Sequence, residues 1–328
     1  RLIYEFVAAI EKKELELWQQ GKRISLELLK NMLTTQENNS SFISFFKQEV
    51  TNSSLKNSTK RNHLSTLMLL QEFKKDITFS DLTFEFVSSF EYFLQLKGYH
   101  TNTIAKHMKH LKRHVNIAIN KEYIEIQKYA FRKYKIKTVE NKHTHLVPEE
   151  LEKLEKLNLS GRYMKLQKSL DAFLFCCYAG MRYSDFINLS SENIVDINQE
   201  TWLIYKSVKT GTEVRLPLYL LFAGKGIIIL NKYRDNLEGF FRLRDNSNVN
   251  KDLLTLAKLA GLSKNISFHT ARHTNATLLI YNGVNITTVQ KLLGHKSVKT
   301  TQVYTNIMDM TIIHDLEKMK QATPFAGK

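Results

Sequence analysis

Proline and glycine are scarce in this chain, with three prolines and 12 glycines among 328 residues. Both residues interrupt helices and form tight turns, so their scarcity favours long helices over a fold of many short strands. No uninterrupted run of about 18 apolar residues is present, and the sequence therefore predicts no membrane-spanning helix and no membrane partner. No signal peptide is visible at the amino-terminal end.

Cysteine is nearly absent, since Cys176 and Cys177 are the only two. Adjacent side chains on a helix point in different directions, and two thiols alone do not form a structural zinc site. Their position inside an apolar run predicts ordinary core residues. We therefore expect a reducing compartment, the cytoplasm.

Acidic residues are too few to balance the basic ones, with 32 Asp and Glu against 48 Lys and Arg, a net charge of +16. Such an excess predicts an anionic partner, with nucleic acid ahead of an anionic membrane surface. The length suits two domains, and 43% hydrophobic residues can fill a sizeable core.

One helix carries much of this charge. We expect it to open at Thr101, as the N-cap, and to run to about Asn120. Helical periodicity groups five apolar residues on one side, namely Ile104, Met108, Leu111, Val115 and Ala118. Three basic residues fall on the opposite side: Lys106, Lys109 and Arg113. Residues 106 to 137 contain ten Lys and Arg but two acids, with His107, His110 and His114 interspersed. This imbalance favours a phosphate-facing surface over a merely solvated face.

A basic segment from Tyr129 to Lys142 follows and is expected to be an extended connection lying along nucleic acid. Its candidate phosphate contacts are Arg132, Lys133, Lys135 and Lys137. We expect an amphipathic helix and polar linker over 1–41, a helical domain over 42–138 with four or five helices up to about Ile126, and a second domain over 139–328. Residues 1–33 could be the remnant of a further domain.

The second domain should open with a helix whose first residue is Pro148, with acids in its first turn. A buried helix is expected from about Met164 to Ala179, ending at Gly180. The alternating stretch from Trp202 to Leu218 predicts a β-hairpin around Thr210-Gly211. Helices are expected again from Lys251 to the end. The predicted fold class is mainly α with one small antiparallel sheet.

The second half also contains a set of residues suited to attack on a phosphodiester. Arg182 precedes Ser184-Asp185, which could cap the next helix and orient the arginine. His269 and Arg272 are three residues apart on a starting helix and share a face. His295 follows Gly294, and Tyr304 lies nine residues further on.

These residue types could replace a metal ion. Arginine forks match phosphate oxygens, and a tyrosine can be the nucleophile. The sequence has no His-Glu-x-x-His motif and no obvious carboxylate cluster, so we expect neither a metal nor another cofactor.

In order and spacing, the set resembles the tyrosine recombinase (phage-type integrase) family, over about residues 42–310. The resemblance implies a helical core-binding domain followed by a mixed α/β catalytic domain. The catalytic residues that it implies are Arg182, Lys209, His269, Arg272, His295 and Tyr304, with Asp185 and His273 in support. The arginines would clamp the phosphate, and Tyr304 would form a 3′-phosphotyrosyl bond. Lys209 would be the general acid, with Lys206 on the same strand as the alternative.

His269 would assist proton transfer or position the phosphate, and His295 would donate a hydrogen bond to it. His273 could equally be a packing residue. The implied partners are double-stranded DNA recombination sites, on which the protein would form a homotetramer, and accessory DNA-bending or directionality proteins could join it. The implied location is the bacterial nucleoid in the cytoplasm.

The subgroup and its task leave alternatives open. Gly294-His295-Lys296-Ser297 and the stretch from Thr300 to Tyr304 look most like integrases of conjugative transposons, which integrate or excise a mobile element. A chromosome-dimer-resolving recombinase of the same family is the main alternative. A type IB topoisomerase and a DNA-binding regulator without catalysis are the others.

Overall fold

The computed structural model describes residues 41–140 and 143–304, together with a few scattered positions before residue 19. The amphipathic helix expected over 1–33 and most of the linker expected over 34–41 therefore lie outside the described residues. The chain divides into two compact units, Arg1–Asn141 and Lys142–Lys328. None of the helices in the described ranges is long and apolar enough to cross a membrane.

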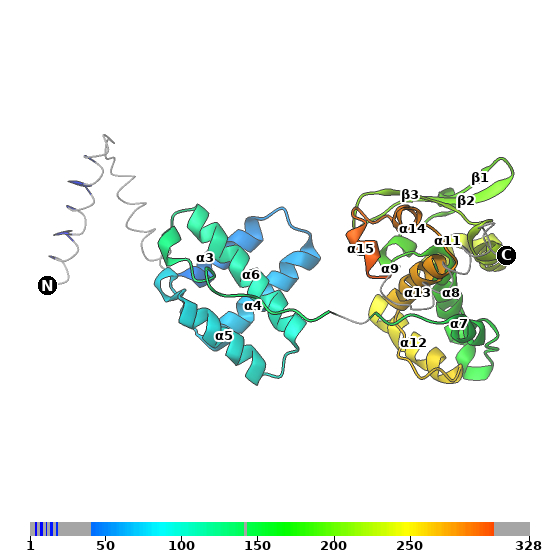
Figure 1. Cartoon of the computed structure of the whole chain (residues 1–328), viewed down its shortest axis with the longest axis horizontal. Helices are drawn as coiled ribbons and strands as arrows, with labels where there is room; N and C mark the ends of the chain where they lie inside the picture. Colours follow the sequence, from blue (N-terminus) through cyan, green and yellow to red (C-terminus); the bar gives the residue numbers. More distant parts are fainter. Residues whose placement is uncertain are drawn as a thin grey trace, which may run out of the picture. The chain divides into compact units, whose positions relative to one another are not determined.

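The first unit contains four α-helices in its described part (Figure 1). They are α3 (Phe42–Asn52), α4 (Asn57–Phe73), α5 (Phe84–Leu96) and α6 (Thr101–Asn120). Short 3₁₀ turns at Phe79–Asp81 and Ile126–Lys128 complete it. Phenylalanines from two of the helices, Phe42, Phe46 and Phe90, are fully buried in a common core. The number of helices agrees with the sequence prediction.

Helix α6 has the two faces that its periodicity predicts. All five residues of the apolar stripe are buried, from Ile104 to Ala118. Lys106, Lys109 and Arg113 are exposed on the other side. The expected cap was wrong: Thr101 is the first helical residue, and His100 is the N-cap without a side-chain hydrogen bond.

The histidines of α6 belong to the core and not to a basic surface. His107 and His114 are buried, and His110 is half-buried. The Thr66 hydroxyl lies 2.8 Å from Nδ1 of both His107 and His110. His63 Nδ1 lies 3.2 Å from His114 Nε2. Burial lowers the pKa of His107 to about 4 and that of His114 to about 3, so these rings are neutral near pH 7.

The basic segment after α6 packs against the first unit along its described part. It has no regular secondary structure from residue 134 onward. Phe131, Tyr134 and Ile136 pack on the core of this unit, and Val139 exchanges two backbone hydrogen bonds with the Asn102 side chain. The intervening basic side chains are exposed: Arg132, Lys133, Lys135 and Lys137. The expected connection without helix or strand is therefore present from residue 134 to residue 140, whereas a turn occupies residues 129–133.

The second unit contains helices around one small sheet. The helices are α7 (Pro148–Glu155), α8 (Gln167–Ala179), α9 (Tyr183–Phe186), α10 (Lys225–Lys232), α11 (Leu237–Phe241), α12 (Asn246–Leu259), α13 (Phe268–Tyr281), α14 (Ile286–Leu293) and α15 (Lys299–Gln302). Pro148 is the first residue of α7, with Glu149 and Glu150 in the first turn, as predicted. The prediction that helices return only at Lys251 was wrong, because α10, α11 and the start of α12 precede it.

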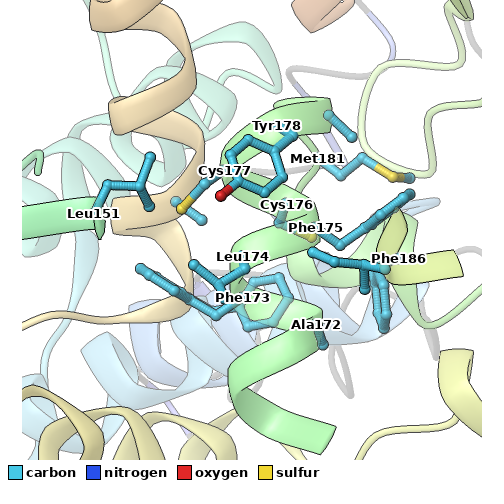
Figure 2. Packing of buried hydrophobic residues seen from close by; sticks show 14 of the residues in the cluster. Leu151, Ala172, Phe173, Leu174, Phe175, Cys176, Cys177, Tyr178, Met181 and Phe186 are labelled. Carbon is cyan, nitrogen blue, oxygen red and sulfur yellow. The ribbon is translucent and has the colours of Figure 1, made fainter. Parts of the chain in front are cut away.

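Helix α8 lies at the centre of this unit. Every residue from Ser169 to Ala179 is buried, which is typical of a helix surrounded by other elements. Figure 2 shows the side chains of Phe173, Phe175 and Cys177 leaving this helix in different directions into the core. Both cysteines are buried core residues, as predicted. The predicted start was three residues early, since Met164 lies in a 3₁₀ turn, Gly161–Leu166, before α8.

The sheet has three antiparallel strands in the order β1 (Ile194–Ile197), β2 (Glu200–Lys206) and β3 (Glu213–Pro217). The expected hairpin is β2–β3, with Leu203 opposite Leu216 and Lys206 opposite Glu213. Strand β1 was not predicted. In Figure 1 the sheet lies along one edge of the unit and α12 along the opposite edge. The architecture is mainly α with one small antiparallel sheet, and the predicted fold class is confirmed.

Candidate active site

Arg182 lies at the junction between α8 and α9, where an aspartate and the β-hairpin hold it. It is the N-cap of α9, so Ser184 and Asp185 lie inside this helix and do not cap it as expected. Arg182 Nη1 is 3.5 Å from Asp185 Oδ2 and 3.2 Å from Ser207 Oγ. Asp185 also accepts a hydrogen bond of 2.9 Å from the backbone N–H of Val208. The aspartate therefore ties the arginine to the hairpin.

Arg272 is a buried cation with 1% of its surface exposed. Its Nη1 donates to the carbonyl oxygen of Gly180 at 2.8 Å, and its Nη2 donates to that of Leu293 at 2.6 Å. These carbonyls stand at the C-terminal ends of α8 and α14, where the helix dipole is negative. Burial and the charge of Arg182 lower the pKa of Arg272 to about 10, which still leaves it charged at neutral pH.

Two glycines allow the helix ends to approach Arg272. Gly180 and Gly294 are the C-caps of α8 and α14, and both have left-handed backbones with positive φ. A Cβ on Gly180 would lie 2.6 Å from Asn275 Oδ1, and a Cβ on Gly294 would lie 2.7 Å from a methyl of Val214. Glycine is therefore required at both positions by the backbone angle and by the space.

Lys209 lies in the turn between β2 and β3, and not within a strand. The strand ends at Lys206, whose partner is Glu213, and the Gly211 N–H donates to the Ser207 carbonyl to close the turn. The Thr210 hydroxyl donates to the Gly294 carbonyl at 3.3 Å, so the turn is fixed beside His295. The charge of Lys209 contributes to lowering the pKa of His269 and of His295, and so Lys209 lies near both rings.

His295 is a buried, neutral ring. Its Nδ1 lies 2.9 Å from the Thr301 hydroxyl, and its backbone is held by Gln290 at both its N–H and its carbonyl. Burial lowers its pKa to about 3, with smaller contributions from Arg272 and Arg182. The ring is therefore available as a hydrogen-bonding group and not as a cation at neutral pH.

His269 and His273 form a cluster of rings on α13. His269 is exposed, whereas His273 is buried with no hydrogen-bond partner on Nδ1 among the described residues. The two rings meet edge to face at 4.4 Å between centroids, and His143 stacks on His273 at 4.4 Å. Partial desolvation of the His269 ring by its packing neighbours, together with the charges of Arg272 and Arg182, lowers the pKa of His269. Burial lowers the pKa of His273 to about 3.

Tyr304 lies just after α15, with 5% of its surface exposed. Its ring is 5.5 Å from that of His273. Burial raises the pKa of the Tyr304 hydroxyl, while the charges of Arg272 and Arg182 act to lower it. The charges of two guanidinium groups of the same unit therefore influence the pKa of this tyrosine.

The second unit thus brings the eight residues of the sequence prediction into one region. Sequence reasoning missed the side chains that hold them: Ser207, Thr210, Thr301 and His143. Of these four, only Ser207 and Thr210, in the hairpin, could have been found from a sequence pattern. Strand alternation places Ser207 on the buried face of β2 with Leu203. His143 and Thr301 join the site only through tertiary contacts, because His143 stacks on His273 and the Thr301 hydroxyl lies 2.9 Å from His295 Nδ1.

Comparison with known families identifies the class of this protein. The phage integrase family matches residues 145–310, and the phage integrase SAM-like domain matches residues 41–136. The two matches cover most of the chain, which therefore belongs to the phage integrase family. It is a tyrosine-type site-specific DNA recombinase, and the resemblance deduced from the sequence motifs is confirmed.

Individual relatives span both units. The tyrosine recombinase XerD of Oceanobacillus iheyensis is 26% identical over 271 residues, which cover 76% of this chain and 86% of that protein. Among solved structures, a lambda integrase tetramer bound to a Holliday junction has a TM-score of 0.66 at 19% identity, covering 91% of this chain and 85% of that one. The Tn1549 transposon integrase in complex with transposon right end DNA has a TM-score of 0.66 at 17% identity, covering 86% of this chain and 99% of that one. At these identities the two structures establish the shared fold.

Proposed function

We propose that this chain breaks and rejoins DNA through a covalent 3′-phosphotyrosyl bond to Tyr304. The observation that carries the proposal is geometric: one unit holds Arg182 against Asp185, fixes Arg272 between two helix ends, and packs Tyr304 against His273, the residue after Arg272. Two guanidinium groups and a tyrosine in one region provide a place where a phosphate can be held next to a nucleophile.

Arg272 is suited to stabilise the charge that develops on the phosphate during attack. Its hydrogen-bond partners are neutral carbonyls, so the phosphate need not displace a carboxylate from it. The guanidinium is fixed in a buried position before the substrate arrives, and preorganised charges of this kind lower the barrier most. Arg182, oriented by Asp185, would hold the other side of the phosphate.

The protons can be assigned to neighbouring groups. As the Tyr304 oxygen bonds to phosphorus, the bond from phosphorus to the 5′-oxygen breaks, and the Lys209 ammonium gives that oxygen a proton. His269, neutral because its pKa is lowered, can accept the proton of the tyrosine. When the Thr301 hydroxyl donates to Nδ1 of His295, the neutral imidazole carries its one proton on Nε2. That N–H can donate a hydrogen bond to the phosphate. His273 would pack against the nucleophile and keep its ring in place.

The biological substrate is the finer part of the proposal. We propose double-stranded DNA sites at the ends of a mobile element, bound by a homotetramer on nucleoid DNA in the cytoplasm with accessory DNA-bending or directionality proteins. Fold likeness to lambda integrase and to the Tn1549 transposon integrase supports this interpretation. The exposed Lys and Arg residues of α6 and of the segment after it would contact phosphates.

A chromosome-dimer-resolving recombinase is the second candidate. It is favoured by the match to a XerD recombinase over 76% of this chain. Sequencing the DNA that is trapped covalently on the protein separates the two. Adducts at the ends of a movable segment support the integrase, whereas adducts at a single chromosomal site support the resolvase.

Covalent trapping also tests the mechanism. Wild-type protein is incubated with fragments of the genome that encodes it, and the trapped site is rebuilt as a nicked suicide substrate. Tyr304→Phe keeps the ring and removes the oxygen, so the adduct on a denaturing gel should disappear while DNA binding persists. Tyr233→Phe, which removes a hydroxyl bound to Asp171, is the matched control and should retain the adduct. An adduct that survives Tyr304→Phe contradicts the assignment.

A further inference from the structure

A second tyrosine hydroxyl is buried in the site without a hydrogen-bond partner. Tyr205 on β2 is 6% exposed, and its hydroxyl has no partner among the described residues. An unpaired buried hydroxyl costs about 1–3 kcal/mol, and buried polar groups are paired in most native structures. A phenylalanine would fill the same space without this cost. An unpaired hydroxyl at this position is therefore consistent with a hydrogen-bond acceptor that the substrate supplies.

Tyr205 lies on the same face of the hairpin as Ser207, which contacts Arg182. Alternate residues of β2 face the interior, so Leu203, Tyr205 and Ser207 share one side. Ser207, the next residue on that side, lies 3.2 Å from both Arg182 Nη1 and Asp185 Oδ2. The partner of Tyr205 across the sheet is Val214.

The other end of this region is the cap of α14. Val214 is the residue that a Cβ on Gly294 would strike, and Gly294 precedes His295. Tyr205 thus lies in the hairpin that carries Lys209, and its partner Val214 packs against the helix end that precedes His295.

The charges around the hydroxyl agree with this position. Burial and Asp185 raise the pKa of Tyr205, while Arg272 and Arg182 act to lower it. The effect is mutual, because Tyr205 and Tyr304 both act on the pKa of Arg272. Both tyrosines therefore lie in the neighbourhood of the buried Arg272 guanidinium. With its pKa raised, Tyr205 stays protonated and can donate a hydrogen bond.

We propose that Tyr205 is a further catalytic residue, whose hydroxyl donates a hydrogen bond to a non-bridging oxygen of the scissile phosphate. This rests on the proposed function, in which Arg182 and Arg272 hold that phosphate. The bond strengthens as negative charge gathers on the oxygen, so it favours the transition state over the bound substrate. It also satisfies the buried hydroxyl only when DNA is present.

The test is Tyr205→Phe in single-turnover cleavage of the nicked suicide substrate. The variant should melt no lower than wild type and bind DNA equally well, because the hydroxyl that it removes had no partner. Its cleavage rate should fall about 10²–10³-fold, the loss seen when a comparable donor is removed. Tyr178→Phe is the matched control, since this buried hydroxyl of α8 binds Glu155, and it should cleave at the wild-type rate.

A sulfur substitution separates contact with the phosphate from a structural effect. Sulfur in place of one non-bridging oxygen accepts hydrogen bonds poorly, and the two diastereomers place it on either oxygen. One diastereomer should be cleaved more slowly than the ordinary phosphate by the wild-type protein. Tyr205→Phe, which has no hydroxyl to lose this contact, should cleave that diastereomer and the ordinary phosphate at the same rate. An equal sulfur effect in both proteins for both diastereomers overturns the proposal, as does wild-type cleavage by Tyr205→Phe. If wild type forms no adduct on any DNA, the proposed function itself fails.

Discussion

At the scale of single residues, the hairpin turn decides which lysine can reach the leaving oxygen. The charge of Lys209 lowers the pKa of His269 and of His295. Lys206 is the last residue of β2, and its side chain is exposed, whereas Ser207 is buried. The Thr210 hydroxyl holds the turn on Gly294. The general acid is therefore expected in the turn and not in the strand.

Lys209→Ala should lower the cleavage rate about 10²–10⁴-fold, the usual contribution of a general acid. A substrate with sulfur at the bridging 5′ position has a leaving group that needs little protonation, and it should restore most of the rate. Lys206→Ala is the control and should cleave both substrates at the wild-type rate. Sulfur rescue of Lys206→Ala, with none for Lys209→Ala, would transfer the role to Lys206.

At the scale of elements, α6 combines a buried stripe with an exposed basic face. Replacing Lys106, Lys109 and Arg113 together with alanine should leave the melting temperature unchanged, because these side chains are exposed. For every phosphate that is no longer neutralised, the slope of log affinity against log salt should fall by about 0.9. DNA binding measured over a salt series should therefore become weaker and less salt-dependent, with little change in sequence preference.

The matched control replaces three exposed lysines of the second unit, Lys153, Lys251 and Lys258. It changes the net charge of the chain by the same amount. If both triple variants show the same slope, the effect is one of total charge, and the face of α6 does not bind DNA.

The same helix should make the first unit sensitive to acid. The pKa values of His107 and His114 are lowered from 6.5 to about 4 and about 3, so the unfolded chain binds protons at a higher pH than the folded one. Above pH 6.5 the two histidines are uncharged in both states and do not change the free energy of unfolding. As the pH falls below 6.5, the unfolded chain binds protons first, so the free energy of unfolding decreases until the pH reaches the folded pKa values of about 4 and about 3. The protection factors of the α6 amides in hydrogen exchange, which are corrected for the pH dependence of the intrinsic rate, should fall over this range.

Replacing one of these rings tests the cause. His114→Leu keeps an apolar side chain against Phe46, which the His114 ring contacts at 3.7 Å between centroids. The loss of α6 protection on acidification should become smaller in this variant. An unchanged pH dependence would assign the acid sensitivity to other groups.

At the scale of the whole molecule, the proposed mechanism takes its positive charge from the protein's own side chains. The net charge of +16 would attract a polyanion over long distances, and the two arginines would act at the phosphate itself. Cleavage of the suicide substrate should therefore proceed at its full rate in excess chelator. A rate that falls in chelator and returns with Mg²⁺ alone would indicate a different mechanism.

The sequence by itself determined the elements and the family. The buried stripe of α6, Pro148 at the start of α7, and the glycines that end α8 and α14 are set by local periodicity and backbone angles, which are written in neighbouring residues. The order and spacing of Arg182, His269, Arg272, His295 and Tyr304 identified the recombinase family. Strand β1 was missed although Asn198 and Gln199, both with positive φ, form the tight turn that joins it to β2.

Only the tertiary structure decided what surrounds these residues. The partners of Arg272 are carbonyls from two helix ends far away in the sequence, and no local pattern encodes them. The sequence pattern assigned His107 and His114 to a basic surface, whereas packing places them in a core. The Tyr205 hydroxyl is buried because β2 turns this side chain to the interior face of the sheet. Burial and hydrogen-bond partners depend on contacts between distant segments, and these contacts set the charge states on which the chemistry depends.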